Sequence, residues 1–236
     1  MLRAQGLRVA YGTNEVLRGL DLTVAPGEIV ALLGLNGSGK STTVKAIAGL
    51  VAPSGGSVTV ADEEISGWSV RRRVQAGITL VAQGRTLFEG MTVSENLSLG
   101  AFVRTDAEAV KADESRWLDR VSLSGLGRRK ASALSGGQQR LVAVARGMMA
   151  NPRFLLLDEP SLGVAPAILT DLRDVLHGLR DDLGVGILLV EQDIPFALAT
   201  ADRVVLLSRG TAVLEERAEH LRGGQEIRRM FFELGA

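Results

Sequence analysis

The sequence predicts an α/β fold built on a largely parallel sheet, with a helical insert at about residues 86–150. Short apolar segments alternate with segments of helical composition in the first and last thirds of the chain, and this alternation is typical of a parallel sheet. The middle third instead carries consecutive helix-start signals. We therefore expect one domain over residues 1–236, with its core in about residues 1–85 and 151–236.

The first third of the chain contains five predicted strands and one predicted helix. Pro26-Gly27 marks a turn between the second and third strands, and residues 53–56 break the pattern after the helix. The helix, at residues 40–50, directly follows a glycine-rich segment. The strands are residues 7–10, 20–24, 29–33, 57–60 and 78–82.

Three helices are predicted in the middle third. Residues 92–95 have the spacing of a capping box, in which two side chains hydrogen-bond each other's backbone at a helix start. Asp106 is expected to cap a second helix that runs to about residue 121. Residues 135–138 repeat the capping-box spacing, and Pro152 ends the helix that follows.

The last third returns to alternating strands and helices. Apolar residues recur at helical spacing over residues 167–183, and Gly184 is a typical residue just past a helix end. Pro195 suits the first turn of another helix, for which Asp193 supplies the cap. The predicted strands are residues 154–157, 185–190 and 204–207.

The composition excludes several classes of site. Lys+Arg and Asp+Glu are each 27, so the net charge is zero and gives no bulk attraction to nucleic acid. Cysteine is absent, which excludes disulfides and thiol catalysis, and two histidines make a zinc site unexpected. No stretch approaches the roughly 18 apolar residues of a spanning helix, and the first six residues lack the apolar core of a signal peptide. We expect an intracellular protein that binds no nucleic acid.

Residues 34–41 (GLNGSGKS) match the P-loop pattern G-x-x-x-x-G-K-[ST]. Glycines let backbone N–H groups turn toward phosphate oxygens, and the following helix adds the partial positive charge of its N-terminus. Lys40 supplies a cation for the outer phosphates, and the Ser41 hydroxyl suits Mg²⁺. A chance match arises in on the order of one chain in a hundred. The strand before the motif and the helix after it favour a nucleotide site.

An apolar strand that ends in two acids, Asp158 and Glu159, fits the second half of such a site. It places carboxylates at the edge of the sheet where α/β proteins bind ligands. Asp158 is expected to hold the Mg²⁺ shell, and Glu159 to orient and deprotonate the attacking water. The alternative, a strand followed by solvated acids, is disfavoured by the P-loop earlier in the chain.

Several residue groups are ambiguous or set aside. Residues 135–137 (Ser-Gly-Gly) could bind an anion, but such a tripeptide is more commonly an ordinary helix start, and these residues alone leave the choice open. Residues 71–73 and 215–217 are predicted to lie on solvated faces. We expect His177 and His220 to be solvated, and Trp68 and Trp117 to pack in the interior.

Residues 134–140 (LSGGQQR), between the P-loop and the strand that ends in Asp158, resemble the signature motif of ABC-type ATPases. The resemblance covers essentially the whole chain. It implies a P-loop NTPase core with a mainly parallel sheet, an N-terminal antiparallel β portion and an inserted helical subdomain that carries the signature. It also implies ATP hydrolysis, with ATP and Mg²⁺ as cofactors.

Individual site residues follow from this resemblance. Tyr11 is placed like the aromatic residue that stacks on adenine, and Gln83 like the Q-loop glutamine that meets Mg²⁺ and the membrane partner. Gln192 replaces the usual switch histidine and, with Glu159, forms the expected catalytic pair. The expected metal-binding residues are Ser41, Gln83 and Asp158. The expected nucleotide-binding residues are Tyr11, Gly34, Leu35, Asn36, Gly37, Ser38, Gly39, Lys40, Ser41, Thr42, Gln83, Ser135, Gly136, Gly137 and Gln138.

Within this superfamily, residues 84–88, 91–97 and 160–166 resemble the smaller ATPase of branched-chain amino acid importers. Residues 190–192 (VEQ) are similar to that subgroup too. Urea-type and other amide importers share much of this pattern, and Gln83 stands where many branched-chain subunits carry Glu. The resemblance therefore implies an import ATPase for branched-chain amino acids, with urea or another amide as the alternative solute.

The resemblance also implies partners. Two such domains pair head to tail, so that Ser135 and Gly137 of one subunit meet the γ-phosphate held by the other, which is a second copy or a distinct ATPase. The chain is expected to dock on membrane permease subunits at the inner, cytoplasmic face of the cell membrane and to serve a solute-binding protein indirectly. Residues 84–91 combine an arginine with Leu87, Phe88 and Met91, a composition that is unusual for a solvent loop; it favours a docking surface for a permease helix over the alternative, anchoring of the helical insert. A non-transport ABC ATPase acting on a soluble assembly is the remaining alternative.

Overall fold

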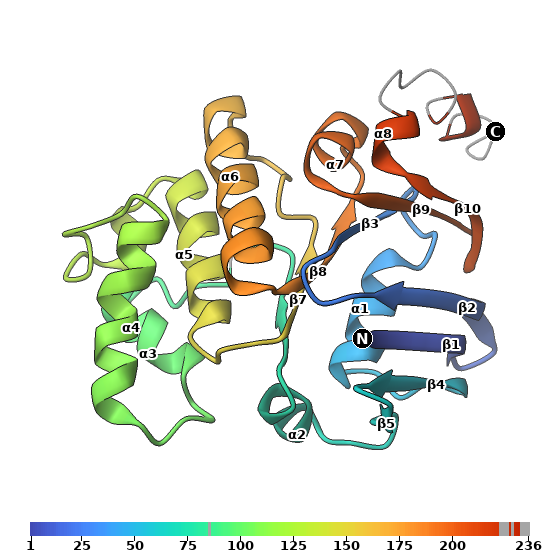
Figure 1. The fold of residues 1–236 in the computed structure, drawn as a ribbon, viewed down its shortest axis with the longest axis horizontal. Helices are drawn as coiled ribbons and strands as arrows, with labels where there is room; N and C mark the ends of the chain where they lie inside the picture. The colour runs from blue at the N-terminus through green and yellow to red at the C-terminus, as the bar shows by residue number, and fades with distance from the viewer. Residues whose placement is uncertain (85, 222–226, 228, 232–236) are drawn as a thin grey trace.

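The computed structural model describes residues 1–84, 86–221, 227 and 229–231, and these residues form two sheets (Figure 1). The strands are β1 (Leu2–Tyr11), β2 (Asn14–Val24), β3 (Ile29–Leu33), β4 (Gly55–Val60), β5 (Glu63–Glu64), β6 (Ile78–Val81), β7 (Phe154–Asp158), β8 (Gly186–Glu191), β9 (Arg203–Ser208) and β10 (Thr211–Arg217). The smaller sheet has the order β2-β1-β4-β5, and the larger one β10-β9-β3-β8-β7-β6.

The larger sheet is parallel except at one edge, as the alternating sequence pattern predicts. The pairs β3–β8, β3–β9, β6–β7 and β7–β8 are parallel, whereas β10 is antiparallel to β9. Every residue of β3, β7 and β8 is buried, which explains their continuous apolar composition. Because β3, β7 and β8 are parallel, their carboxyl ends lie next to one another along one side of the sheet.

The smaller sheet is antiparallel, which confirms the expected N-terminal β portion. In it β1 lies between β2 and β4. Both β1 and β2 are longer than the sequence predicts, because polar residues at their solvated positions hide the apolar alternation. The buried positions of β1 are Leu2, Ala4, Leu7 and Val9.

Three α-helices of the described residues lie between β6 and β7 along the chain and gather on the side of the molecule away from the antiparallel sheet (Figure 1). They are α3 (Val93–Gly100), α4 (Ala107–Arg120) and α5 (Gly136–Met148). Their apolar side chains, such as Leu97, Trp117 and Leu141, join one core cluster with β3 residues. The remaining helices are α1 (Lys40–Ala48), α2 (Val70–Gln75), α6 (Pro166–Leu183), α7 (Ile194–Thr200) and α8 (Ala218–Leu221). Among the described residues, no helix is both long and apolar enough to cross a bilayer.

Three of the four predicted helix caps are present. Thr92 and Ser135 each begin a helix with a complete capping box, and Asp193 accepts a hydrogen bond from the backbone N–H of Phe196 at 2.8 Å. The prediction for Asp106 is wrong: it stands at the N-cap of α4 but caps no backbone group. Its carboxylate instead binds the Arg104 guanidinium at 2.7 Å, which lowers the pKa of Asp106.

The prediction that residues 71–73 form a solvated face is wrong for Arg73. Its side chain is 1% exposed, and its guanidinium donates to the backbone oxygens of Ala46 and Ile47, both at 2.7 Å, and to that of Ser66. Ala46 and Ile47 lie in the last turn of α1, where carbonyl groups lack the usual partner one turn further on; the Ala46 oxygen also accepts the Gly49 N–H at 3.1 Å. Arg73 therefore caps the C-terminus of α1 from a neighbouring helix.

The two tryptophans and the two histidines follow the sequence predictions in part. Trp117 is buried as predicted, whereas Trp68 is half-buried, and Arg72 lies over its ring at 3.6 Å. His220 is exposed as predicted. The prediction for His177 is wrong, because this half-buried side chain lies 3.0 Å from the backbone oxygen of Thr200 and joins α6 to α7.

We predict that Arg73→Met costs about 3–5 kcal/mol of unfolding free energy, because it removes a buried guanidinium that donates to the backbone oxygens of Ile47 and Ser66. The matched control is Arg72→Met, whose side chain is 59% exposed; it should change the stability by less than about 1 kcal/mol. Urea denaturation of both variants measures the difference. Equal, small losses would contradict the capping role of Arg73.

A candidate nucleotide-binding and hydrolysis site

The candidate site lies at the edge where β3, β7 and β8 end. The P-loop follows β3, and α1 begins at Lys40, so the predicted order of strand, loop and helix is present. Asp158 is the last residue of β7, and Glu191 the last of β8. Ser41 and Thr42, two further predicted site residues, lie in the first turn of α1.

The P-loop backbone takes a path that only glycine permits at two positions. A Cβ atom on Gly34 would lie 2.4 Å from the Ser38 hydroxyl oxygen and 2.6 Å from the backbone oxygen of Leu207. Gly39 has φ +111°, and a Cβ there would lie 2.7 Å from a methyl carbon of Leu17. The loop is therefore pressed against its surroundings, and its curvature aims backbone N–H groups toward its concave side.

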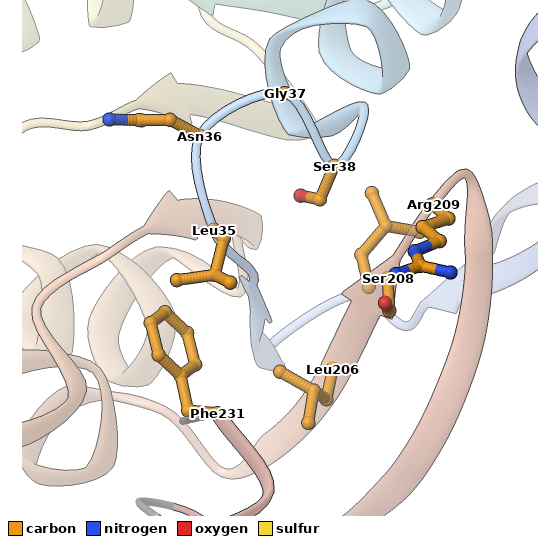
Figure 2. Close-up of a pocket in the computed structure, with 9 residues that line it drawn as sticks. Leu35, Asn36, Gly37, Ser38, Leu206, Ser208, Arg209 and Phe231 are labelled. Atoms are coloured by element: carbon orange, nitrogen blue, oxygen red, sulfur yellow. The ribbon is translucent and has the colours of Figure 1, made fainter. Parts of the chain in front are cut away.

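The outer side of the P-loop faces the end of β9 and the side chain of Phe231. A cavity of about 250 Å³ separates them, and Figure 2 shows Leu35 next to the ring of Phe231, with Asn36 pointing away from both. Gly210, in the turn after β9, donates its backbone N–H to the backbone oxygen of Ser38 at 3.0 Å. The cavity is lined by Leu35, Asn36, Gly37, Ser38, Leu206, Leu207, Ser208, Arg209 and Phe231.

Lys40 is the buried cation of the site. Its side chain is 4% exposed, and Nζ donates to the backbone oxygens of Gly34 at 2.8 Å and Leu35 at 3.1 Å. The Ser38 hydroxyl is buried too and has no hydrogen-bond partner in the part of the chain that the structure describes. A buried ammonium, an unpaired hydroxyl and a helix N-terminus together provide the donors that a polyphosphate requires. The residues present therefore fit a nucleotide.

Ser41 and Asp158 supply hard oxygen ligands. The Ser41 hydroxyl donates to Oδ1 of Asp158 at 3.0 Å, and burial raises the pKa of Asp158 while this hydrogen bond opposes the rise. Among the described residues, no three His, Cys, Asp or Glu side chains gather into a metal cluster. One carboxylate and one hydroxyl, completed by phosphate oxygens, are a typical Mg²⁺ environment. The pair therefore fits the predicted metal, and these two residues would hold it. Gln83, the third predicted metal ligand, donates its amide N–H to Glu159 at 2.7 Å, and its role at the metal stays a prediction.

Glu159 is held in a constrained position beside Lys40. Its backbone has φ +47°, a left-handed conformation that costs a non-glycine residue about 1–3 kcal/mol, and its N–H donates to Val190 at 2.9 Å. One carboxylate oxygen accepts a hydrogen bond from Gln83 Nε2 at 2.7 Å, and the other lies 3.4 Å from Lys40 Nζ. The structure thus brings together five of the predicted site residues: Lys40, Ser41, Gln83, Asp158 and Glu159.

Among the described residues, no hydrogen bond joins the side chain of Gln192 or Tyr11 to these groups. Gln192 directly follows β8 and is half-buried, and no hydrogen bond between described residues joins its side chain to Glu159. Tyr11 ends β1 at the first hairpin and is 50% exposed. Their roles in catalysis and in adenine stacking stay predictions.

The signature residues form an exposed helix start. The Ser135 hydroxyl accepts from the Gln138 N–H at 3.2 Å, and Gln138 Oε1 accepts from the Ser135 N–H at 3.1 Å. A Cβ on Gly136 would meet nothing, whereas one on Gly137 would lie 2.8 Å from Ile168 of α6. Gly137 is therefore needed for the packing of α5 on α6. No described contact joins Ser135 to the P-loop of the same chain.

Comparison with known families identifies this arrangement. The family model described as ABC transporter matches residues 17–162, more than half of the chain. The match includes the P-loop, the signature and the Asp158-Glu159 pair. The chain belongs to the ABC transporter family.

Relatives of this ABC protein are similar along their whole length. The high-affinity branched-chain amino acid transport ATP-binding protein BraG of Pseudomonas aeruginosa is 34% identical over 229 residues, which cover 97% of each chain. The lipopolysaccharide export system ATP-binding protein LptB of Escherichia coli K12 is 32% identical over 98% of this chain and 96% of its own. A nucleotide-free ATP-binding cassette from an ABC transporter has a TM-score of 0.91 at 27% identity, covering 100% of this chain and 98% of that one.

These comparisons confirm the predicted fold and enzyme class. The chain has the ABC ATPase cassette fold, with a mainly parallel sheet, an N-terminal antiparallel sheet and helices. It is an ATP-hydrolysing subunit of a transporter. Its relatives include an ATPase of branched-chain amino acid transport and one of lipopolysaccharide export, so its solute is a separate question.

Sequence reasoning gave no role to two buried charged residues of this ABC ATPase. Glu191, between Val190 and Gln192, is 1% exposed, and Arg140 of α5 is 8% exposed. A charged residue that directly ends a fully apolar strand was the available signal for Glu191. The arginine of the signature segment gave no comparable signal, because most arginines on helices are solvated.

We predict that Lys40→Ala and Glu159→Gln impair this ATPase in different ways. Lys40→Ala removes the buried cation, so ATP affinity and turnover both fall. Glu159→Gln keeps the size of the side chain but removes the proton acceptor, so ATP still binds while turnover falls by about 10²–10⁴-fold. Lys111→Ala, an exposed lysine of α4, is the control and keeps both properties. ATP titration and phosphate release measure them; normal turnover in Glu159→Gln would contradict the assignment.

A second prediction concerns Gln192. Gln192→Ala should lower turnover by about ten- to a thousandfold, the loss expected for one or two transition-state hydrogen bonds. Gln192→His should retain activity and acquire a pH dependence between about 6 and 7, because imidazole titrates there and an amide does not. Rates against pH at saturating Mg-ATP, with Gln75→Ala on α2 as a control, test both points. An unchanged rate in Gln192→Ala would make the residue only a part of the helix start.

Proposed function

We propose that this ATPase powers the import of branched-chain amino acids through membrane permease subunits. The full-length similarity to BraG supports this solute, and so do the segments at residues 84–88, 160–166 and 190–192. Import of urea or another amide is the alternative, because urea-type and other amide importers share much of the pattern in those segments. The coupling to a membrane partner is carried by one observation, an apolar groove beside Gln83.

The groove has a volume of about 420 Å³ and is bordered by α1, α2, β6, α3 and α5. Large apolar side chains normally turn inward, and a contiguous exposed patch of them typically marks a binding surface. A groove between helices that is lined in this way suits an amphipathic or apolar helix from a partner. The exposed apolar residues along it are Leu50, Val70, Phe88, Leu99 and Phe102.

Phe88 is presented to this groove by a rigid support. The Asn96 side chain is fully buried; it accepts a hydrogen bond from the Phe88 N–H at 2.9 Å and donates to the Phe88 oxygen at 3.1 Å. Its neighbour Leu87 turns inward and is 9% exposed. Within residues 84–91, Phe88 therefore serves the proposed docking surface, whereas Leu87 anchors the segment to the core.

A short path links the groove to the hydrolysis site. Gln83 precedes Phe88 by five residues, and its amide binds the Glu159 carboxylate at 2.7 Å. A partner that moves the segment between them would change how Glu159 is held. The same path would report the state of the nucleotide to the permease.

For hydrolysis, we assign Lys40 to the outer phosphates and Glu159 to the attacking water. The Lys40 ammonium offsets phosphate charge in a buried place where electrostatic interactions are strong. The Glu159 carboxylate accepts the water proton, and its hydrogen bond to Gln83 orients it. Mg²⁺, held by Ser41 and Asp158, would supply further neutralisation of the phosphate oxygens.

The proposal includes a second ATPase subunit. Ser135 and Gly136 are exposed, and Leu162, which follows Glu159 closely, is 58% exposed. A second copy or a distinct ATPase, facing head to tail, would cover these groups and place the signature on the neighbour's nucleotide. The assembled pair would sit on the permease at the cytoplasmic face of the membrane and act on solute delivered by a solute-binding protein.

Uptake by the source cells tests the proposed solute. Deletion of the gene should lower the uptake of labelled leucine, and the gene with Glu159→Gln should not restore it, whereas the unaltered gene should. Labelled urea, taken up by the same cells, is the internal comparison. Loss of urea uptake alone would replace the amino-acid assignment by the amide one, and unchanged uptake of both would overturn the import proposal.

We predict that Phe88→Asp uncouples the ATPase from its membrane partner. ATP hydrolysis by the purified chain should stay within about twofold, whereas co-sedimentation with membranes and leucine uptake should be lost, because a carboxylate in an apolar groove repels an apolar helix. The matched control is Leu183→Asp, an exposed apolar residue at the far end of α6. Unfolding of the purified Phe88→Asp chain would show that Phe88 belongs to the core.

A further inference from the structure

Glu191 is a buried carboxylate at the edge of the sheet that the hydrolysis scheme leaves unused. One of its oxygens accepts the Ser161 N–H at 2.9 Å, and the other accepts the Ser161 hydroxyl at 2.7 Å. The second oxygen also accepts the backbone N–H groups of Gln192 at 3.1 Å and Asp193 at 3.4 Å. A single side chain thus binds two segments: the loop after Glu159 and the segment that carries Gln192.

These contacts fix the loop after Glu159 at two points on β8. The first is the hydrogen bond from the Glu159 N–H to Val190, and the second is the pair from Ser161 to Glu191. Only Pro160 lies between the two attached residues. The left-handed backbone of Glu159 needs such support, because an unsupported residue would relax to an ordinary conformation.

Burial of the Glu191 carboxylate costs free energy, and hydrogen bonds and a nearby positive charge offset this cost. Burial raises the pKa of Glu191, and the hydrogen bonds from Ser161 and the following backbone oppose that rise. Arg140, buried on the helix that begins at the signature, acts electrostatically on both Glu191 and Asp158 without a salt bridge to either. An apolar residue would fill the same space at a lower cost in stability. The buried carboxylate, with four hydrogen-bond donors and a nearby guanidinium, therefore serves to fix the positions of the segments that it binds.

We propose that Glu191 is a positioning residue for ATP hydrolysis: it holds the Glu159 loop and the Gln192 segment as one unit. Glu191 touches no reacting atom and acts through Ser161 and the Gln192 backbone. A carboxylate that must meet a water molecule is sensitive to displacements of about 1 Å, and such displacements lower turnover by about 10²-fold. Loss of this link therefore lowers turnover while the P-loop keeps its affinity for ATP.

A residue with only a structural role would behave differently. It would lower the stability and the folded fraction, while each folded molecule would turn over at the normal rate. Glu28 provides this comparison, because its carboxylate accepts the Ala25 N–H at 2.8 Å and pairs with Arg203 at 2.9 Å, next to β3 at the opposite edge of the sheet. Glu28→Gln is therefore a matched control for Glu191→Gln.

The test compares Ser161→Ala, Glu191→Gln, their double variant, Glu28→Gln and Glu159→Gln. ATP affinity, stability and turnover per folded molecule are measured for each. Ser161→Ala should lower turnover by about 3–10-fold and Glu191→Gln by about 10–100-fold, with ATP affinity within about twofold. The double variant should be no slower than Glu191→Gln by more than about twofold, because both changes remove one shared interaction. Glu28→Gln should lose stability alone.

Each other outcome overturns the inference or locates its failure. Turnover within about twofold of normal in Ser161→Ala and Glu191→Gln, or a parallel loss of ATP affinity, would leave Glu191 a structural residue. Additive losses in the double variant would show that Ser161 and Glu191 act separately. If Glu191→Gln does not fold, Ser161→Ala decides, because it removes only one hydroxyl. The inference rests on Glu159 as the base, and normal turnover in Glu159→Gln would show that this assignment, not the link, is at fault.

Discussion

The parallel pairing of β3, β7 and β8 is the constraint on which the site depends. Parallel strands end at the same edge, so the segments that follow them are neighbours however far apart they lie in the sequence. Ser41 and Asp158 are separated by 117 positions and still share a hydrogen bond of 3.0 Å. The register sets the depth of each group, because Asp158 pairs with Val190 and Leu33 with Glu191. Every residue of these strands is buried, so a slip of register would move the whole site.

Charge is concentrated at this edge at a cost to stability. Lys40, Asp158, Glu159, Glu191 and Arg140 are each at most 8% exposed. A buried ion destabilises a protein unless partners surround it, and here the partners are one another and the backbone. Such concentrations of buried charge are typical of functional sites, where geometry is favoured over stability. The apolar groove beside Gln83 is the complementary case, in which apolar surface faces outward.

The sequence predicts the elements whose signals are local. The apolar runs of the parallel strands, the capping boxes at Thr92 and Ser135 and the P-loop glycines all follow from nearest-neighbour chemistry, and the structure contains them. Interactions between segments that lie far apart in the chain could not be predicted from these local patterns. The sequence around Arg73 predicts a surface charge, and only the position of α1 shows that its side chain caps that helix. The sequence at Gly137 predicts a flexible helix start, and only the position of Ile168 shows that a side chain would not fit there. The edge strand β10 was missed, because most of its residues are exposed and no apolar pattern marks it.

The central claim is that the groups at the carboxyl ends of β3, β7 and β8 form one site for ATP hydrolysis. A crystal structure of the Glu159→Gln variant with Mg-ATP tests it most directly, because the variant should bind ATP without hydrolysing it. The claim predicts that Lys40 Nζ contacts a phosphate oxygen, that Mg²⁺ contacts the Ser41 hydroxyl and lies at Asp158, and that Ser161 keeps its hydrogen bonds to Glu191. A triphosphate bound elsewhere, such as in the cavity between the P-loop and Phe231, would contradict it. So would a P-loop nucleotide around which the Glu159 loop has left β8.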